Sequence, residues 1–112
     1  MSRELILTRQ YCGIVTRIEC LIRPLAGAQG LWSLVCAAGM DGLQPSEVRA
    51  QGPFHGRRET EATLREIVAR LVSQGYRLRE GLGIWQLHLH GELRRENAAR
   101  GHRAHRQNLP WQ

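Results

Sequence analysis

The sequence predicts an α+β domain built on a single antiparallel sheet of four to five strands, with one amphipathic helix packed on one face of the sheet. Three observations lead to this prediction. Several short stretches alternate apolar and polar residues, which is the period of a half-buried strand. One later stretch changes to the period of a helix, and the connections between the alternating stretches are short, which favours antiparallel neighbours. The expected order is β-β-β-β-α-β, followed by a basic C-terminal helix or tail.

The first two strands are expected at residues 4–8 and 13–23. The first is short and is expected at an edge of the sheet. The second alternates along its whole length and is rich in β-branched residues, which fits a half-buried strand. Pro24 ends it, and the glycines of residues 24–30 provide a hairpin connection. One face of this strand carries Ile14, Thr16, Ile18, Cys20 and Ile22, and the other carries Val15, Arg17, Glu19, Leu21 and Arg23.

Two further strands and the helix follow. The strands are expected at residues 31–38 and from Glu47 to about Gly52, with a loop rich in glycine between them. From about Arg57 to Gln74 the apolar residues recur at helical spacing, so this segment is the predicted amphipathic helix. Glutamates near its start suit the helix dipole, and a glycine directly after it suits its end.

A last strand is expected over residues 84–90, where the alternation places Trp85, Leu87 and Leu89 inward. Residues 92–100 have a helix-forming composition with almost no apolar stripe, so a frayed helix that passes into a mobile tail is expected. The predicted organisation is therefore one α+β domain over residues 1–91 and a basic, partly helical or disordered tail over residues 92–112.

The expected core combines the inward positions of the strands with the apolar stripe of the helix. Because only one helix is predicted to cover the sheet, the second face of the sheet is expected to stay open to water or to a partner. The core residues are predicted to be Ile14, Ile18, Ile22, Trp32, Leu34, Val48, Leu64, Ile67, Val68, Leu71, Trp85, Leu87 and Leu89.

All 16 basic residues are arginine, and the formal net charge is +6. Arginine binds carboxylates and phosphates through two parallel hydrogen bonds and stacks on bases, so such a surface suits nucleic acid or acidic partners. A GC-rich bacterial-type genome that favours arginine codons would give the same composition. The charge is uneven, because residues 91–112 carry five arginines against two acids and so hold half of the excess.

The three cysteines, Cys12, Cys20 and Cys36, have no Cys-x-x-Cys spacing, which argues against a zinc ribbon, a redox motif and a secreted disulfide framework. The sequence has no run near the roughly 20 apolar residues that a membrane helix needs, and its N-terminus does not resemble a signal peptide. We therefore expect a cytoplasmic protein that does not bind membranes.

Catalysis has no motif to support it. The sequence lacks a phosphate-binding glycine loop, a nucleophile elbow and a zinc-protease helix. His88 and His90 share one face of the expected last strand and His102 and His105 lie three apart, but neither pair has a close third ligand, so solvent-facing histidines are favoured over a metal site. We expect no enzymatic activity, no metal and no small-molecule cofactor.

Two kinds of partner remain open. A protein–protein interaction or regulatory module that self-associates, for example as a homodimer, is the first prediction, because an open sheet face and an apolar end to the tail suit a protein partner. The alternative is a nucleic-acid-binding module that uses an arginine-rich sheet face and the tail. The residues predicted to bind the partner are Arg17, Arg23, Arg49, His88, His90, Arg94, Arg95, Arg100 and Trp111.

Overall fold

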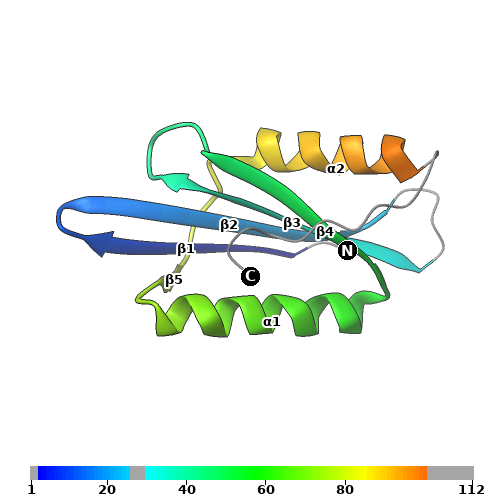
Figure 1. The fold of residues 1–112 in the computed structure, drawn as a ribbon, viewed down its shortest axis with the longest axis horizontal. Helices are drawn as coiled ribbons and strands as arrows, with labels where there is room; N and C mark the ends of the chain where they lie inside the picture. Colours follow the sequence, from blue (N-terminus) through cyan, green and yellow to red (C-terminus); the bar gives the residue numbers. More distant parts are fainter. Residues whose placement is uncertain (1–2, 26–29, 101–112) are drawn as a thin grey trace.

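A five-stranded antiparallel sheet lies between two helices in the computed structural model, which describes residues 3–25 and 30–100 (Figure 1). The prediction of an α+β fold with one antiparallel sheet is confirmed. The second helix on the sheet is a difference from the sequence prediction. In chain order the elements are β1 Arg3–Tyr11, β2 Ile14–Pro24, β3 Leu31–Met40, β4 Glu47–His55, α1 Arg57–Ser73, β5 Arg77–Arg79 and α2 Gln86–Arg100.

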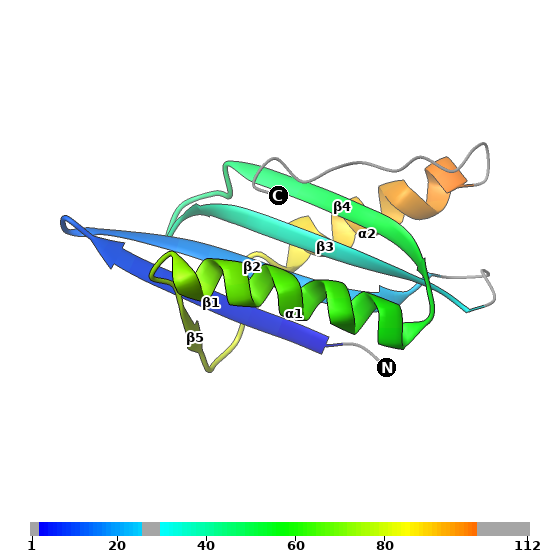
Figure 2. The same ribbon diagram turned by 60° about the horizontal axis from the view of Figure 1, so that its bottom comes forward.

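The strands lie in the order β4-β3-β2-β1-β5. The first four form a meander, and every neighbouring pair is antiparallel. Helix α1 then carries the chain across one face of the sheet, from β4 at one edge to the short strand β5 at the other (Figure 2). Strand β1 is longer than the predicted segment 4–8 and does not form an edge, because β5 pairs with its residues Ile6, Leu7 and Thr8.

A two-residue turn joins β1 to β2. Cys12 and Gly13 both have positive φ angles, 53° and 78°, which is the backbone of a type I′ turn and matches the right-handed twist of the strands it joins. This turn fixes the register in which Tyr11 faces Ile14. Two residues with opposed Cα atoms point to the same side of the sheet, so Tyr11 and Ile14 share one face.

Helix α1 covers one face of the sheet. Its buried residues Leu64, Ile67 and Leu71 pack on the apolar side chains of the central strands. These three sites confirm the helical stripe predicted from the sequence. The strand residues in this first core are Leu7, Ile18, Cys20, Ile22, Leu34 and Cys36.

Helix α2 covers the other face, which corrects two predictions. The segment predicted as a strand at residues 84–90 enters a helix at Gln86, and the sheet face predicted to be open is covered. Trp85, Leu89 and Leu93 recur every four residues, so they point to one side of a helix and bury together. Together with residues in and beside the sheet they form the second core; these residues are Leu21, Leu25, Val35, Ala37 and Ala50.

The predicted core is correct at most positions and wrong at two. Ile14 is exposed because β2 extends beyond the end of α1, and Leu87 is 86% exposed because a helix turns it away from the sheet. Three predicted core residues, Trp32, Val48 and Val68, are only partly buried. The other eight, Ile18, Ile22, Leu34, Leu64, Ile67, Leu71, Trp85 and Leu89, are buried.

Helix α2 also runs across the predicted boundary between residues 91 and 92, and Leu93 beyond that boundary is buried. The part of the predicted tail after Arg100 lies outside the described residues. Within residues 3–25 and 30–100, neither helix has the length and apolar character needed to cross a membrane.

Candidate functional site

One end of the long axis of the molecule carries exposed apolar side chains from two neighbouring connections. The molecule measures 44 × 25 × 25 Å, and the turn between β1 and β2 lies at one end of it (Figure 1). Tyr11 and Ile14 flank this turn and are 72% and 49% exposed. Met40 and Leu43, at the connection from β3 to β4, are 47% and 59% exposed. We call these four residues the apolar end.

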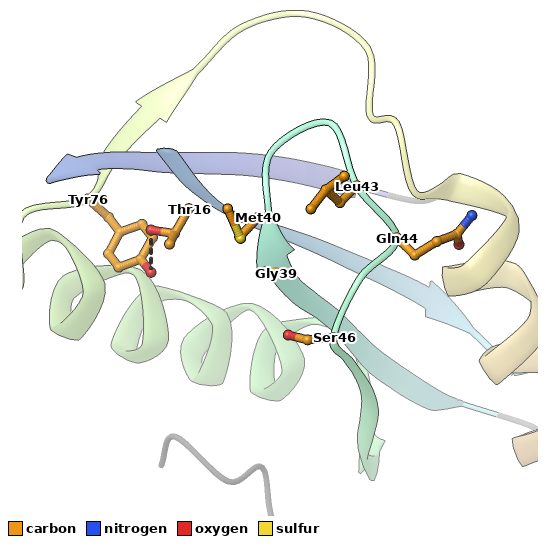
Figure 3. A pocket seen from close by; sticks show the side chains of 7 residues that line it. All are labelled: Thr16, Gly39, Met40, Leu43, Gln44, Ser46 and Tyr76. Carbon is orange, nitrogen blue, oxygen red and sulfur yellow. Dashed lines mark hydrogen bonds between the residues drawn. The ribbon is translucent and has the colours of Figure 1, made fainter. Parts of the chain in front are cut away.

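A groove of about 380 Å³ opens beside the apolar end (Figure 3). It lies between the β3–β4 connection and Tyr76, which follows α1. Its volume falls within the range of roughly 300–1,000 Å³ that is usual for binding pockets. None of the described residues that line it carries a charge: they are Thr16, Gly39, Met40, Leu43, Gln44, Ser46 and Tyr76.

Tyr76 is held at the wall of the groove by two contacts. The Thr16 hydroxyl donates a hydrogen bond of 3.1 Å to the Tyr76 hydroxyl (Figure 3). The guanidinium of Arg9 lies 4.9 Å from the centroid of the Tyr76 ring, a cation–π arrangement, and its Nη1 donates to the backbone oxygen of Gln74 at 3.3 Å. The cation of Arg9 is therefore directed to the ring and to the end of α1.

The loop that forms the other wall is tied down from both sides. Trp85 Nε1 donates a hydrogen bond of 2.8 Å to the backbone oxygen of Leu43, and Ser46 N donates one of 2.9 Å to the backbone oxygen of Ala38. Gly39 is needed for this approach, since a Cβ atom there would lie 2.8 Å from Ser46 N. These contacts keep Leu43 exposed at a fixed place on the groove.

Sequence reasoning did not identify the groove as a site. Three chain segments that are far apart in the sequence build it: β2, the β3–β4 connection, and Tyr76 between α1 and β5. The one available signal was Tyr11 next to a possible turn at Cys12 and Gly13, because an aromatic residue at a tight turn has few neighbours that can bury it.

Arg17 lies on the face covered by α2 and has several partners within the chain. Its Nε donates to Glu19 Oε2 at 2.6 Å, its Nη1 to Asp41 Oδ1 at 3.0 Å, and its Nη2 to the backbone oxygen of Leu82 at 3.4 Å. Only 12% of its side chain is exposed. The structure therefore places Arg17 inside an ion-pair network rather than on an open basic platform.

Arg23 on β2 contacts His90 on α2. Arg23 Nη1 lies 3.3 Å from His90 Nδ1. His88 is exposed, and because the two histidines lie two apart on a helix, they point to different sides. The shared strand face predicted for His88 and His90 is therefore wrong. Within the described residues no group of three or more candidate metal ligands is found.

The remaining predicted partner-binding residues lie apart from one another. Arg49 is exposed on the edge strand β4, 3.4 Å from Glu47. Arg94 and Arg95 are exposed on α2, and Arg95 Nη2 lies 2.6 Å from Glu92 Oε1. The side chain of Arg100, and all of His102, His105 and Trp111, lie outside the described residues.

The cysteines divide into one exposed residue and one buried pair. Cys12 is exposed in the β1–β2 turn, whereas Cys20 and Cys36 are buried opposite each other under α1. The hydrogen bond with Cys20 is the main cause, and burial the second, that raises the pKa of the Cys36 thiol well above its ordinary value. Such a thiol is not activated as a nucleophile at neutral pH.

The family model described as PA4575-like protein matches residues 1–110. The comparison with curated proteins and the comparison with solved structures each gave no match.

Proposed function

The chain belongs to the PA4575-like protein family, and we propose that it is a non-enzymatic protein–protein interaction module that self-associates through its apolar end. The observation that carries this proposal is the combination, at one end of the molecule, of projecting apolar side chains and an uncharged groove. Exposed aromatic and aliphatic residues beside a hollow are typical of sites at which a few side chains provide most of the binding energy.

A second copy of the chain is the proposed occupant of the groove. Tyr11 and Ile14 share the sheet face of Thr16, which lines the groove. One surface therefore offers both a projection and a hollow, as a two-fold symmetric interface requires. Seating Tyr11 and Ile14 of each copy in the groove of the other would remove both from water.

The charge distribution also favours this end. Two copies that each carry a formal charge of +6 repel each other, so the surfaces that can meet at least cost are those without charged side chains. The described residues that line the groove meet this condition. We further propose that the module acts in the cytoplasm, where thiols stay reduced, and the three free cysteines support this.

The experiment that tests the proposal compares Tyr11→Ser with wild type by light scattering under reducing conditions, over a range of protein concentrations. Loss of one interface anchor should weaken self-association by roughly 2 kcal/mol, or about thirtyfold in Kd. Leu87→Ser is the matched control, because Leu87 is also a large exposed hydrophobic residue but lies on α2, away from the apolar end. A wild-type chain that is monomeric at all concentrations, or equal effects of the two substitutions, would overturn the proposal.

Nucleic-acid binding remains the alternative proposal, supported by the exposed arginines of α2 and β5, such as Arg77, Arg79 and Arg94. Its proposed platform is smaller than the sequence suggested, because Arg17 and Arg23 have partners inside the chain. Protein purified without nuclease should then carry nucleic acid that strips off in high salt, visible as a falling ratio of absorbance at 260 and 280 nm. Replacing Arg77, Arg79 and Arg94 by Gln should remove it.

A further inference from the structure

Two of the three cysteines face each other in the middle of the sheet. Cys20 on β2 is paired directly with Cys36 on β3. The Cys36 thiol donates a hydrogen bond to Cys20 Sγ, with the two sulfur atoms 3.2 Å apart. Both are free thiols. A disulfide bond is about 2.05 Å long, so the sulfur atoms need to approach by only about 1 Å to form one.

The backbone places this pair at a position that permits a disulfide. In an antiparallel ladder, hydrogen-bonded and non-hydrogen-bonded pairs alternate. Asp41 N donates to Val15 O at one end of the β2–β3 ladder, and Leu25 N donates to Leu31 O at the other. Val15 with Asp41 and Leu25 with Leu31 are therefore hydrogen-bonded pairs. Cys20 lies five positions from Val15 and five from Leu25, and an odd number of positions leads to the other type of pair. Cys20 and Cys36 thus form a non-hydrogen-bonded pair.

Non-hydrogen-bonded pairs bring side chains closer together than their neighbours do. Their Cα atoms are about 4.5 Å apart, which lies within the range of roughly 4.4–6.8 Å that a disulfide spans. The strands therefore do not have to separate, slip or change register for the two sulfur atoms to bond. Rotation of the two side chains is sufficient.

The core residues around the two thiols shield them from oxidants in solution. Both thiols are fully buried, and they share the first core with Leu64, Ile67 and Leu71 of α1. Arg49 on β4 is paired with Cys36 on the same side of the sheet. An oxidant can reach the sulfur atoms only when α1 moves transiently away from the sheet.

From this geometry we propose that Cys20 and Cys36 are a redox-active dithiol that closes to a cross-strand disulfide on reaction with a low-molecular-weight disulfide. The Cys20 sulfur, which accepts the hydrogen bond of the Cys36 thiol, attacks as a thiolate a sulfur atom of the oxidant, whose S–S bond breaks and releases one thiolate. Cys36 then gives up its proton to that released thiolate, attacks the Cys20 sulfur of the mixed disulfide and releases the other thiolate. The chain loses two electrons and two protons, and the oxidant becomes two thiols.

The test uses oxidised glutathione and the full chain with Cys12→Ser, which removes the exposed thiol without touching the core. After incubation and acid quenching, intact mass should fall by two hydrogen atoms, and dithiothreitol should restore it. Because the second step is intramolecular, the chain with the Cys20–Cys36 disulfide should exceed the chain with attached glutathione by roughly tenfold or more. Dithiothreitol oxidised in a parallel sample shows that the oxidant is active. Two results would overturn the proposal: a chain that only carries attached glutathione, or a chain that forms neither product although dithiothreitol in the parallel sample is fully oxidised.

Three further variants in the same background separate the pair from general reactivity. Cys20→Ala and Cys36→Ala each leave one buried thiol, so neither should lose two hydrogen atoms. Ile67→Val removes one methylene group from the side of α1 that covers the pair and should speed closure several-fold by loosening that helix. An unchanged rate in Ile67→Val would contradict access by movement of α1.

Discussion

Glu19 is a buried carboxylate that joins the sheet to the start of α2. Only 2% of it is exposed. Its two oxygens accept hydrogen bonds from the backbone nitrogens of Ile84 and Trp85, at 2.8 and 3.1 Å, and from Arg17. A negative charge at this place satisfies the two backbone donors directly before the helix and suits the helix dipole. Gly83 makes room for it, since a Cβ atom there would lie 2.6 Å from Glu19 Oε1.

Replacement of Glu19 by Gln should therefore destabilise the fold strongly. The amide cannot accept all three hydrogen bonds, and it leaves the guanidinium of Arg17 without its closest anion. We expect a loss of about 3 kcal/mol in the free energy of unfolding, measured by urea denaturation.

Glu47→Gln provides the matched control for this substitution. Glu47 lies on the edge strand β4, and it forms an exposed ion pair with Arg49. Exposed pairs contribute between about 0 and 1 kcal/mol. If Glu19→Gln costs no more than Glu47→Gln, the buried carboxylate does not have the anchoring role described.

Cys36 should make the fold less stable in alkali. The hydrogen bond with Cys20 and burial raise the pKa of Cys36 in the folded chain above its ordinary value of 9.0. Above about pH 9 the unfolded chain therefore releases this proton while the folded chain keeps it, and the free energy of unfolding falls as pH rises, by up to about 1.4 kcal/mol per pH unit. Urea denaturation from about pH 8 to about pH 10 should show a shallower fall for Cys36→Ala than for wild type.

At the scale of the elements, α2 is the part of the fold that the sequence pattern misplaces. Trp85, Leu87 and Leu89 alternate as a strand would, but Trp85, Leu89 and Leu93 also recur every four residues. Over so short a segment the two periods cannot be separated by counting apolar residues. The second face of the sheet decides between them, because Leu21 and Val35 there need a covering layer.

Alanine substitutions on α2 should distinguish its buried side from its exposed side. Leu89→Ala and Leu93→Ala remove buried side chains from the second core, and each should lower the free energy of unfolding by about 2–5 kcal/mol. Leu87→Ala lies on the same helix but is exposed, so its effect should stay within about 0.5 kcal/mol. A strand over residues 84–90 would instead make Leu87 as sensitive as Leu89, which thermal and urea denaturation of the three variants would reveal.

For the whole molecule, the sequence predicts the sheet and α1 well because both depend on local periodicity and on turns. The positions Ile18, Cys20 and Ile22 of β2 and the stripe Leu64, Ile67 and Leu71 of α1 identify the first core directly. The other face of β2, expected to be open, is buried as well. The cover of the second face depends on a long-range contact between α2 and the middle of the sheet, and the local spacing of apolar residues over residues 84–93 fits a strand as well as a helix. Leu21, which the alternation places on the face predicted to be open, belongs to this second core.

The candidate site is predicted less well than the fold for the same reason. The arginines of β2 alternate as an exposed face would, yet α2 and the loop before it bring partners to Arg17 and Arg23. The groove exists only where β2, the β3–β4 connection and Tyr76 meet.

Sedimentation equilibrium of the wild-type chain at low and high salt, under reducing conditions and free of nucleic acid, tests self-association most directly. Added salt screens the repulsion between two copies of net charge +6 and leaves apolar contacts in place. Self-association through the apolar end predicts a concentration-dependent dimer whose Kd stays constant or falls as salt is raised. A dimer that dissociates in high salt, or a monomer under both conditions, would contradict it.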